Sequence, residues 1–305
     1  MQAPNMNDIP FNKALDLAPE QADEPMPGVR RVMADNPGPF TFKGTISYVI
    51  GRGKVAIIDP GPDDPYHVKA LLNAVRNETV THIFVTHTHN DHSPAVPAIK
   101  AATGALTYAE GPHRASRPLR AAETLRPADR AFRPDVTLKD GDVVSGHGWT
   151  LEAVTTPGHT ANHAAFALKG TEMLFSGDHV MGWSTSIVAP PDGSMRDYVA
   201  SLHKLKKRGE SLYFPGHGPA ITDATRFVDH FIRHRKAREE SIVQQLSKAP
   251  SDIPGIVSTS YPGLDPRLLQ AAGMSVLAHL EDLATRGVVN TDGPAAIDSV
   301  YRLAG

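Results

Sequence analysis

Seven histidine and aspartate residues lie where the sequence predicts the ends of four β-strands, and each carries a side chain that can bind a metal ion. Four of them follow the apolar, β-branched run 81–86, and the other three follow later apolar runs and are each preceded by glycine. The seven are His87, His89, Asp91, His92, His159, Asp178 and His217. Imidazole and carboxylate groups without thiolate are typical ligands of Zn²⁺, with Fe or Mn as alternatives. The pattern therefore predicts a metal site built from strand ends.

Seven ligands are too many for one tetrahedral ion and suit two ions. The expected groups are His87, His89 and His159 for one ion and Asp91, His92 and His217 for the other, with Asp178 bridging them. Hydrolases of this type hold two ions about 3.5–4 Å apart, and water bound to such ions has a pKa of about 7. The hypothesis is therefore a hydrolase whose nucleophile is a metal-bridging hydroxide, with Asp91 acting both as ligand and as proton acceptor.

The other histidines favour a structural interpretation. A single histidine at a strand end is more often part of the packing than a metal ligand. We prefer that interpretation for His67, His82, His147, His163 and His279.

Strands and helices alternate along the chain, and most strands are expected as hairpins, which favours a layered α/β or α+β arrangement. The first forty residues have no sustained period and are expected to form an extended arm. Two hairpins are expected, turning at Asp140-Gly141 and at Lys169-Gly170. The expected strands are 40–50, 54–59, 81–86, 105–109 and 212–214, with the hairpins over 136–154 and 163–176, and the expected helices are 64–76 and 195–207.

Composition limits the classes of protein that fit. The chain has 305 residues, and 31 Lys and Arg against 33 Asp and Glu give a formal net charge of −2. This balance excludes a basic field over the whole chain, although a local patch remains open. Cysteine is absent, which removes disulfides and thiolate ligands. No apolar run approaches the roughly 18–20 residues that span a bilayer, and the start lacks the features of a secretory signal. We expect a cytoplasmic protein with no membrane partner.

The ligand pattern resembles that of the metallo-β-lactamase fold superfamily. The string from His87 to His92 matches the superfamily motif HxHxDH, and the three later ligands match in order and spacing. The resemblance covers residues 38–225. It implies an α+β fold, the αββα sandwich, in which two mixed sheets pack face to face with helices outside and metals at one edge. Asp59, in Ile-Ile-Asp-Pro-Gly, matches a superfamily aspartate that supports the metal site without binding the metal.

Two features resemble the branch that contains the lactamase-β-like endoribonucleases. One is the segment 176–186, which is similar to the loop after the bridging aspartate in that branch. The other is the tail, which is similar to a winged-helix appendage with helices over 238–246 and 265–287 and a final hairpin over 288–301. The expected domains are an N-terminal arm (1–37), a catalytic domain (38–230) and a winged-helix-like domain (231–305).

The resemblance leaves two classes of substrate open for a zinc-dependent hydrolase with two Zn²⁺ per chain. One is single-stranded RNA or another phosphodiester, with Trp183 stacking on a base and three basic stretches, 204–208, 233–238 and 114–133, binding phosphates. The other is a small-molecule ester, thioester or lactone, for which the apolar segment 181–188 and the tail would form an acyl-binding wall. The true β-lactamases generally lack the bridging carboxylate, so Asp178 limits β-lactam hydrolysis to a side activity.

Several roles remain open at this point. His179 is a candidate for the acid that protonates the leaving group, although a buried supporting role is favoured. Trp183 could equally pack a loop. The tail could bind nucleic acid, cover the edge of the active site or form a homodimer.

Overall fold

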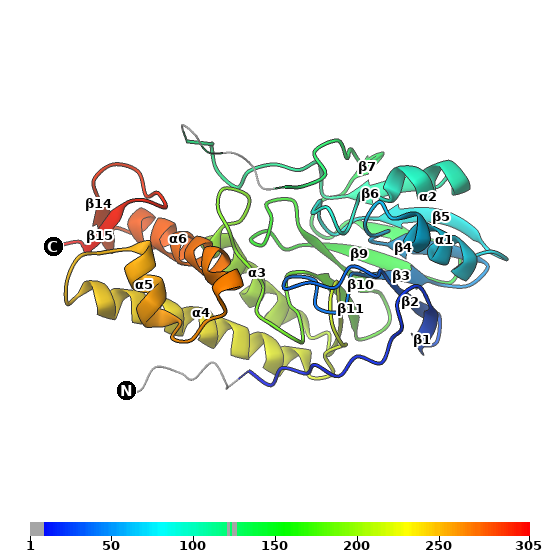
Figure 1. Cartoon of the computed structure of the whole chain (residues 1–305). Helices are drawn as coiled ribbons and strands as arrows, with labels where there is room; N and C mark the ends of the chain where they lie inside the picture. The colour runs from blue at the N-terminus through cyan, green and yellow to red at the C-terminus, as the bar shows by residue number, and fades with distance from the viewer. Residues whose placement is uncertain (1–8, 121–122, 124–126) are drawn as a thin grey trace.

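Two mixed sheets packed face to face form the centre of the molecule (Figure 1). The computed structural model describes residues 9–120, 123 and 127–305. In the first sheet the strands lie in sequence order, and β4, β5, β6 and β7 run parallel to one another. These strands are β1 (Ala22–Met26), β2 (Val29–Met33), β3 (Ile46–Ile50), β4 (Lys54–Ile58), β5 (Thr79–Phe84), β6 (Leu106–Ala109) and β7 (Val136–Thr137).

The second sheet has the order β12-β11-β10-β9-β8. All its pairs are antiparallel except β11 with β12. Its strands are β8 (Val143–Ser145), β9 (Thr150–Thr155), β10 (Ala164–Leu168), β11 (Met173–Gly177) and β12 (Leu212–Pro215). The expected hairpin around Lys169-Gly170 is therefore confirmed as β10–β11.

The alternating directions of successive side chains along the strands explain why both faces of each sheet are covered. In β3, Ile46 and Tyr48 face the second sheet, whereas Val49 faces the outer helices. In β10, Phe166 lies between the sheets and Ala165 lies on the opposite face. Successive side chains in a strand point to opposite faces, so a strand that is apolar at every position must be buried on both sides. The result is the αββα sandwich (Figure 1).

Helices cover the two outer faces. Helices α1 (Pro65–Ala74) and α2 (Val96–Thr103) pack on the first sheet, and α3 (Met195–Arg208) and the first half of α4 (Ala224–Leu246) pack on the second. Local capping signals set the ends of α3, since the Ser194 side chain accepts a hydrogen bond from the backbone N–H of Asp197 and Gly209 ends the helix in the left-handed region.

The N-terminal region differs from the expectation of an extended arm. Strands β1 and β2 form a hairpin through Gly28, and β2 pairs with β3, so residues 22–33 belong to the first sheet. The physical reason is burial: Val29, Val32 and Met33 are almost fully buried in the sandwich. Residues 1–8 of the predicted arm lie outside the described residues.

The predicted hairpin over 136–154 is also wrong. Strand β7 pairs with β6 in the first sheet, while β8 pairs with β9 in the second. The chain crosses between the sheets at Asp140-Gly141, where the Asp140 carboxylate accepts a hydrogen bond from the backbone N–H of Thr155. The turn signal does mark a change of direction, but the strands on its two sides lie in different layers.

The C-terminal part has its own core and a small third sheet of β13 (Ser251–Asp252), β15 (Val300–Leu303) and β14 (Val289–Thr291). Helix α5 (Ile253–Ser260), the short η2 (Pro266–Leu268) and α6 (Leu269–Thr285) complete it. Helix α4 runs without a break through residues 230 and 231, where the sequence suggested a domain boundary. Within the described residues, no helix is both long and apolar enough to span a membrane.

Candidate metal centre

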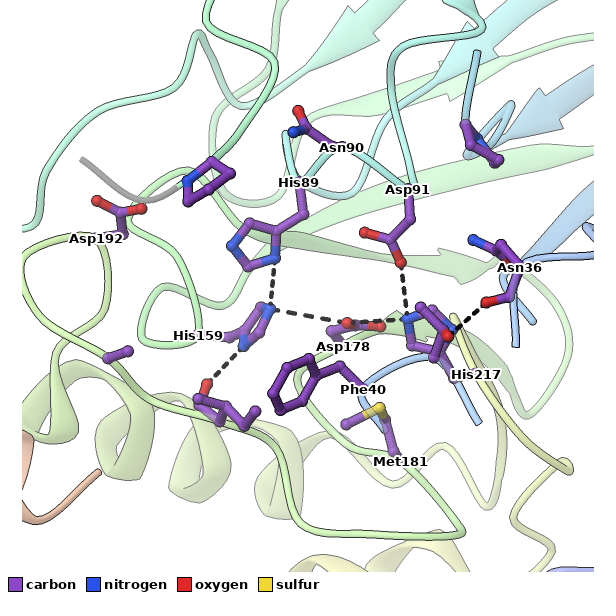
Figure 2. Close-up of a pocket in the computed structure, with 15 residues that line it drawn as sticks. Asn36, Phe40, His89, Asn90, Asp91, His159, Asp178, Met181, Asp192 and His217 are labelled. Carbon is purple, nitrogen blue, oxygen red and sulfur yellow. Dashed lines mark hydrogen bonds and ion pairs between the residues drawn. The ribbon is translucent and has the colours of Figure 1, made fainter. Parts of the chain in front are cut away.

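The seven predicted ligands come together at one edge of the sandwich, because the strands that carry them end at the same place. His87 to His92 follow β5, His159 follows β9, Asp178 follows β11 directly and His217 follows β12. The two sheets are linked beside the site, where the backbone N–H of Ile46 donates to the Gly216 carbonyl at 2.8 Å. Figure 2 shows several of these side chains pointing toward one another.

The first group of potential ligands contains three histidines. His89 Nδ1 lies 3.0 Å from His87 Nε2 and 3.0 Å from His159 Nε2. His159 Nδ1 donates to the Ile187 carbonyl at 2.6 Å, and His87 Nδ1 lies 3.0 Å from Thr86 Oγ1. Because His87 and His159 each use the hydrogen on Nδ1 in these contacts, their Nε2 atoms carry lone pairs, and both lone pairs face His89 Nδ1. One Nδ1–H group can serve only one such lone pair well, whereas a cation between the three nitrogens would satisfy all of them.

The second group contains Asp91, His92 and His217, whose potential ligand atoms all lie within 4.8 Å of one another. His217 Nε2 lies 3.2 Å from Asp91 Oδ2, and His92 Nε2 lies 3.4 Å from the same oxygen. Thr45 Oγ1 donates to Asp91 Oδ2 at 3.0 Å and so holds that carboxylate in place.

Asp178 lies between the two groups. Its Oδ2 is 3.7 Å from His159 Nε2 and 3.3 Å from His217 Nε2. Its Oδ1 is 3.6 Å from His92 Nε2. A carboxylate in this position faces nitrogens of both groups with its two oxygens, which is the arrangement that a bridging ligand requires.

The residues present fit two metal ions. His92 Nε2 and Asp178 Oδ1 are buried and make no hydrogen bond within the described part of the chain. A Cβ atom at Gly216 would come within 2.5 Å of Asp178 Oδ1, so glycine leaves open the space between these groups. Buried polar atoms without partners are costly, and a cation bound by imidazole and carboxylate removes that cost.

The directions of the pKa shifts differ between the two groups of ligands: the first group favours neutral imidazoles, and the second favours positive charge. Burial and the neighbouring imidazoles hold the pKa of His87 and of His89 well below the usual value. Burial also lowers the pKa of His217, but Asp178 and Asp91 outweigh it and raise that pKa to about 9. The two carboxylates therefore demand positive charge at this point, which a bound cation can supply.

Asp59 lies behind the metal centre. It follows β4, is 2 % exposed and accepts a hydrogen bond from His92 Nδ1 at 2.9 Å. It also accepts from the backbone N–H of Thr86 at 2.7 Å and from Thr86 Oγ1 at 2.6 Å. The contact with His92 leaves that ring's Nε2 as the lone-pair nitrogen, which is how a carboxylate orients a ligating histidine.

Two residues singled out from the sequence do not reach the cavity. His179 is fully buried, packs against Tyr198 with ring centroids 4.4 Å apart, and has its pKa lowered to about 3 by burial. Trp183 stacks on Phe42 with ring centroids 4.9 Å apart. Neither side chain is among the described residues that line the cavity; burial was the favoured interpretation of His179, and packing within a loop was the alternative for Trp183.

The remaining histidines belong to neither ligand group. His163 is buried beside the site, and its Nε2 accepts a hydrogen bond from the backbone N–H of Asp178 at 3.2 Å. His67 is buried against Ser47, with 2.9 Å between His67 Nε2 and Ser47 Oγ. A structural role for these two agrees with the sequence interpretation.

A cavity of about 400 Å³ opens over the metal centre (Figure 2). Its wall is formed by the segments after β2, β5 and β11, and by Pro62 and Pro127. Besides the ligands, the lining residues are Asn36, Phe40, Thr41, Pro62, Asn90, Pro127, Met181, Ile187, Ala189 and Asp192. The apolar segment 181–188 was visible in the sequence, but nothing local marked Phe40 or Asp192. None of the described residues after His217 lines this cavity, so the tail does not form the expected wall.

A family model described as the metallo-beta-lactamase superfamily matches residues 41–217. The chain belongs to the metallo-β-lactamase superfamily. A second model, the beta-lactamase associated winged helix domain, matches residues 253–295 of this superfamily member. These matches confirm the αββα fold and the winged-helix tail.

Two curated relatives carry related names. The chain is 33% identical over 224 residues to the beta-lactamase-like protein 2 homolog of Caenorhabditis elegans, covering 72% of this chain and 71% of that protein. It is 30% identical over 233 residues to the lactamase-like protein nscB of Aspergillus fumigatus, covering 74% of this chain and 64% of that protein.

Solved structures support the fold. A beta-lactamase domain protein from Burkholderia ambifaria superposes with a TM-score of 0.77 at 20% identity, covering 95% of each chain. A metallo-beta-lactamase family protein from Thermus thermophilus superposes with a TM-score of 0.73 at 22% identity, covering 91% of this chain and 99% of that chain. This superfamily member therefore shares the complete two-part architecture with known proteins.

Proposed function

We propose that this protein is a binuclear metal-dependent hydrolase, with zinc as its metal, that cleaves an ester or thioester of an apolar small molecule. The observation that carries this proposal is the lining of the cavity. Its wall beyond the ligands is mainly apolar, with Phe40, Met181 and Ile187 among its side chains, and no Lys or Arg is among the described residues that line it. Ligand pockets of this kind bind substrates through apolar contacts and a few polar groups.

A single-stranded RNA substrate is less well supported, because several cations of the basic stretches are engaged in internal ion pairs. Lys206 pairs with Asp229 at 2.6 Å and Arg208 with Glu152 at 2.7 Å. Arg117 binds the carboxylate of Glu281 on α6 at 2.7 Å. Phosphate binding needs cations that face solvent along a groove, and cations already held by carboxylates contribute little to it.

Two of the four cations in the stretch 233–238 are also engaged within the protein. Arg235 is 3 % exposed and donates to the Ser186 carbonyl, and Arg238 donates to the Ser260 carbonyl and lies over the Tyr261 ring. Arg126, in the third stretch, lies outside the described residues. Arg235 thus joins α4 to the loop after β11, and Arg238 joins α4 to α5, so both side chains hold parts of the protein together.

The residues of the site have separable tasks in this proposal. One metal would be held by His87, His89 and His159 and the other by Asp91, His92 and His217, with Asp178 shared. Bound there, the metals would polarise the substrate carbonyl and lower the pKa of water at the site. Asp91 lines the cavity and is fixed by Thr45, so its carboxylate can accept the proton of the attacking water. The apolar wall positions the substrate and excludes bulk water.

The test compares substrates on the zinc-loaded protein, with Asp91→Ala and Asp63→Ala prepared identically. Asp63 is an exposed aspartate just after Asp59 and serves as the control. We expect hydrolysis of acyl thioesters and aryl esters by the wild type and by Asp63→Ala, with nearly complete loss in Asp91→Ala. Cleavage of labelled single-stranded RNA that depends on Asp91, with no thioester or ester turnover, would overturn the proposal in favour of an endoribonuclease.

A further inference from the structure

A half-buried asparagine, Asn36, lies in the wall of the cavity over the metal centre (Figure 2). Its side chain makes two hydrogen bonds with a single residue, the fully buried Thr45. The Thr45 backbone N–H donates to Asn36 Oδ1 at 2.8 Å, and Asn36 Nδ2 donates to Thr45 Oγ1 at 3.0 Å. Because a backbone N–H can only donate, the first bond fixes the amide so that its NH₂ group faces the Thr45 hydroxyl.

The contact from Asn36 decides where the hydrogen of the Thr45 hydroxyl points. A hydroxyl has one hydrogen, and Thr45 Oγ1 already accepts from Asn36 Nδ2. The hydrogen is therefore available for Asp91 Oδ2, 3.0 Å away, which as a carboxylate oxygen accepts it. The three side chains thus form a chain of hydrogen bonds with one direction, from the Asn36 amide through the Thr45 hydroxyl to the Asp91 carboxylate.

This chain ends on the oxygen of Asp91 that faces the histidines of the second ligand group. Asp91 Oδ2 lies 3.2 Å from His217 Nε2 and 3.4 Å from His92 Nε2. These contacts and the one from Thr45 all involve Oδ2, so Oδ1 is the oxygen left for a water molecule. The proposed function gives Asp91 two tasks, ligand and proton acceptor, and a fixed rotation of the carboxylate assigns one oxygen to each.

The segment after β2 keeps Asn36 and Thr45 together. The backbone N–H of Ala34 donates to the Thr45 carbonyl at 2.8 Å. Thr41 Oγ1 donates to the Asn36 carbonyl at 2.6 Å. The backbone on both sides of the side-chain contacts is therefore held in place before a substrate binds, which is what the precise placement of a reacting group requires.

We propose that Asn36 is a positioning residue for Asp91, which acts through Thr45 to hold one carboxylate oxygen toward the second group of ligands and to leave the other for the attacking water. This inference rests on the proposed hydrolysis. Asn36 is expected to affect turnover and metal affinity, and to do so only while Thr45 carries its hydroxyl. An asparagine that served only the Thr45 backbone N–H would not depend on that hydroxyl.

The experiment is a double-mutant cycle on these two residues. Asn36→Ala removes both side-chain bonds, and Thr45→Val removes the hydroxyl at nearly constant shape. Hydrolysis of thioesters and aryl esters by the zinc-loaded protein gives kcat and KM. Competition with a chelator gives the zinc content per chain without any turnover.

We expect kcat to fall about 3- to 10-fold in Asn36→Ala and about 10- to 100-fold in Thr45→Val, with KM nearly unchanged. Each variant should also release one zinc equivalent at lower chelator concentration than the wild type. Adding Asn36→Ala to Thr45→Val should change kcat and zinc retention by less than about twofold, because the hydroxyl through which Asn36 acts is already absent.

Conservative variants keep the test sharp. Thr45→Ser retains the hydroxyl and is expected to retain the dependence on Asn36. Asn36→Asp keeps an oxygen for the Thr45 backbone N–H but cannot donate to Thr45 Oγ1, so its kcat should fall at least as far as in Asn36→Ala. Asn73→Ala changes an exposed asparagine on α1 and serves as the control that matches the wild type. Thermal melting checks the fold of each variant.

The outcomes distinguish this inference from the proposed function. Earlier zinc release in Asn36→Ala that disappears in the Thr45→Val background, without turnover of any thioester or ester, would support the positioning role and refute the proposed reaction. Additive losses in the double variant, wild-type turnover by Asn36→Asp, or a loss confined to KM would overturn the inference and leave the hydrolase intact.

Discussion

Replacing Asp59 by asparagine tests whether the hydrogen bond behind the metal centre sets the tautomer of His92. Asp59 accepts from three donors: His92 Nδ1, Thr86 N–H and Thr86 Oγ1. In Asp59→Asn one of the two oxygens becomes an NH₂ group, so at least one donor must face another donor. The position has φ of 50°, which asparagine adopts as readily as aspartate does, so the backbone is expected to be unchanged.

The size of the effect follows from these contacts. If the oxygen stays with Thr86 N–H, the new NH₂ faces His92 Nδ1, and the ring must carry its proton on Nε2, the nitrogen that would bind the metal. A hydrogen bond to a charged group contributes about 1.5–3 kcal/mol, and each 1.4 kcal/mol is a tenfold change in affinity. We therefore expect the metal held by His92 to bind about 10- to 100-fold more weakly, as is typical for partners of metal-ligating histidines.

The assay is competition of the purified protein with a chelator of known affinity, read as metal content per chain. Asp59→Asn should release one equivalent at lower chelator concentration and retain the other, while Asp63→Asn, a change at an exposed aspartate nearby, should match the wild type. Equal retention of both metals by Asp59→Asn and the wild type would refute the role assigned to Asp59. Loss of both together would show that the two groups do not act separately.

Further predictions concern the bridging position, a glycine and a buried histidine. Asp178→Ala is expected to lose one metal equivalent and nearly all hydrolysis, measured by metal analysis and turnover; a two-metal, fully active variant would remove Asp178 from the bridging position. Gly158→Ala places a Cβ 2.3 Å from Tyr198 Cα at a φ of 138°, so we expect a loss of at least about 2 kcal/mol in unfolding free energy, measured by denaturant titration. Burial lowers the pKa of His67 to about 4 in the folded protein, whereas a histidine in the unfolded chain has a pKa of about 6.5. Between about pH 4 and pH 6.5 the unfolded chain therefore binds more protons than the folded chain. Stability should therefore fall as pH decreases from about 6.5 to about 4, and His67→Gln should reduce this slope in unfolding measured across that range; an unchanged slope would contradict it.

Local sequence signals were sufficient for most elements close to the metal centre. The apolar run before His87 and the glycines before His159, Asp178 and His217 mark strand ends, and all four strands are present. Helix α3 was expected over 195–207 and spans Met195–Arg208, because its amphipathic pattern is a local property. The winged-helix hairpin was also expected and forms as β14 and β15.

Local sequence patterns gave wrong predictions where the segment that a strand pairs with lies far away in the chain. The turn at Asp140-Gly141 looks like a hairpin turn, but whether the following strand returns to its neighbour or joins another sheet depends on packing between layers. The sequence of the β1–β2 hairpin predicts an extended arm, because two short strands of mixed burial show little regular alternation of apolar and polar residues.

The sequence by itself determined the chemistry of the candidate site. Residue types and strand-end spacing were enough to predict an imidazole–carboxylate metal site, because both can be recognised in short stretches of the chain. Only the tertiary structure decided which other side chains surround that site. The apolar cavity wall is assembled from separate loops, and nothing in the sequence around Phe40 or Asp192 marks these residues as part of it. Loop positions follow from the packing of the layers beneath them, and that packing is a property of the whole chain.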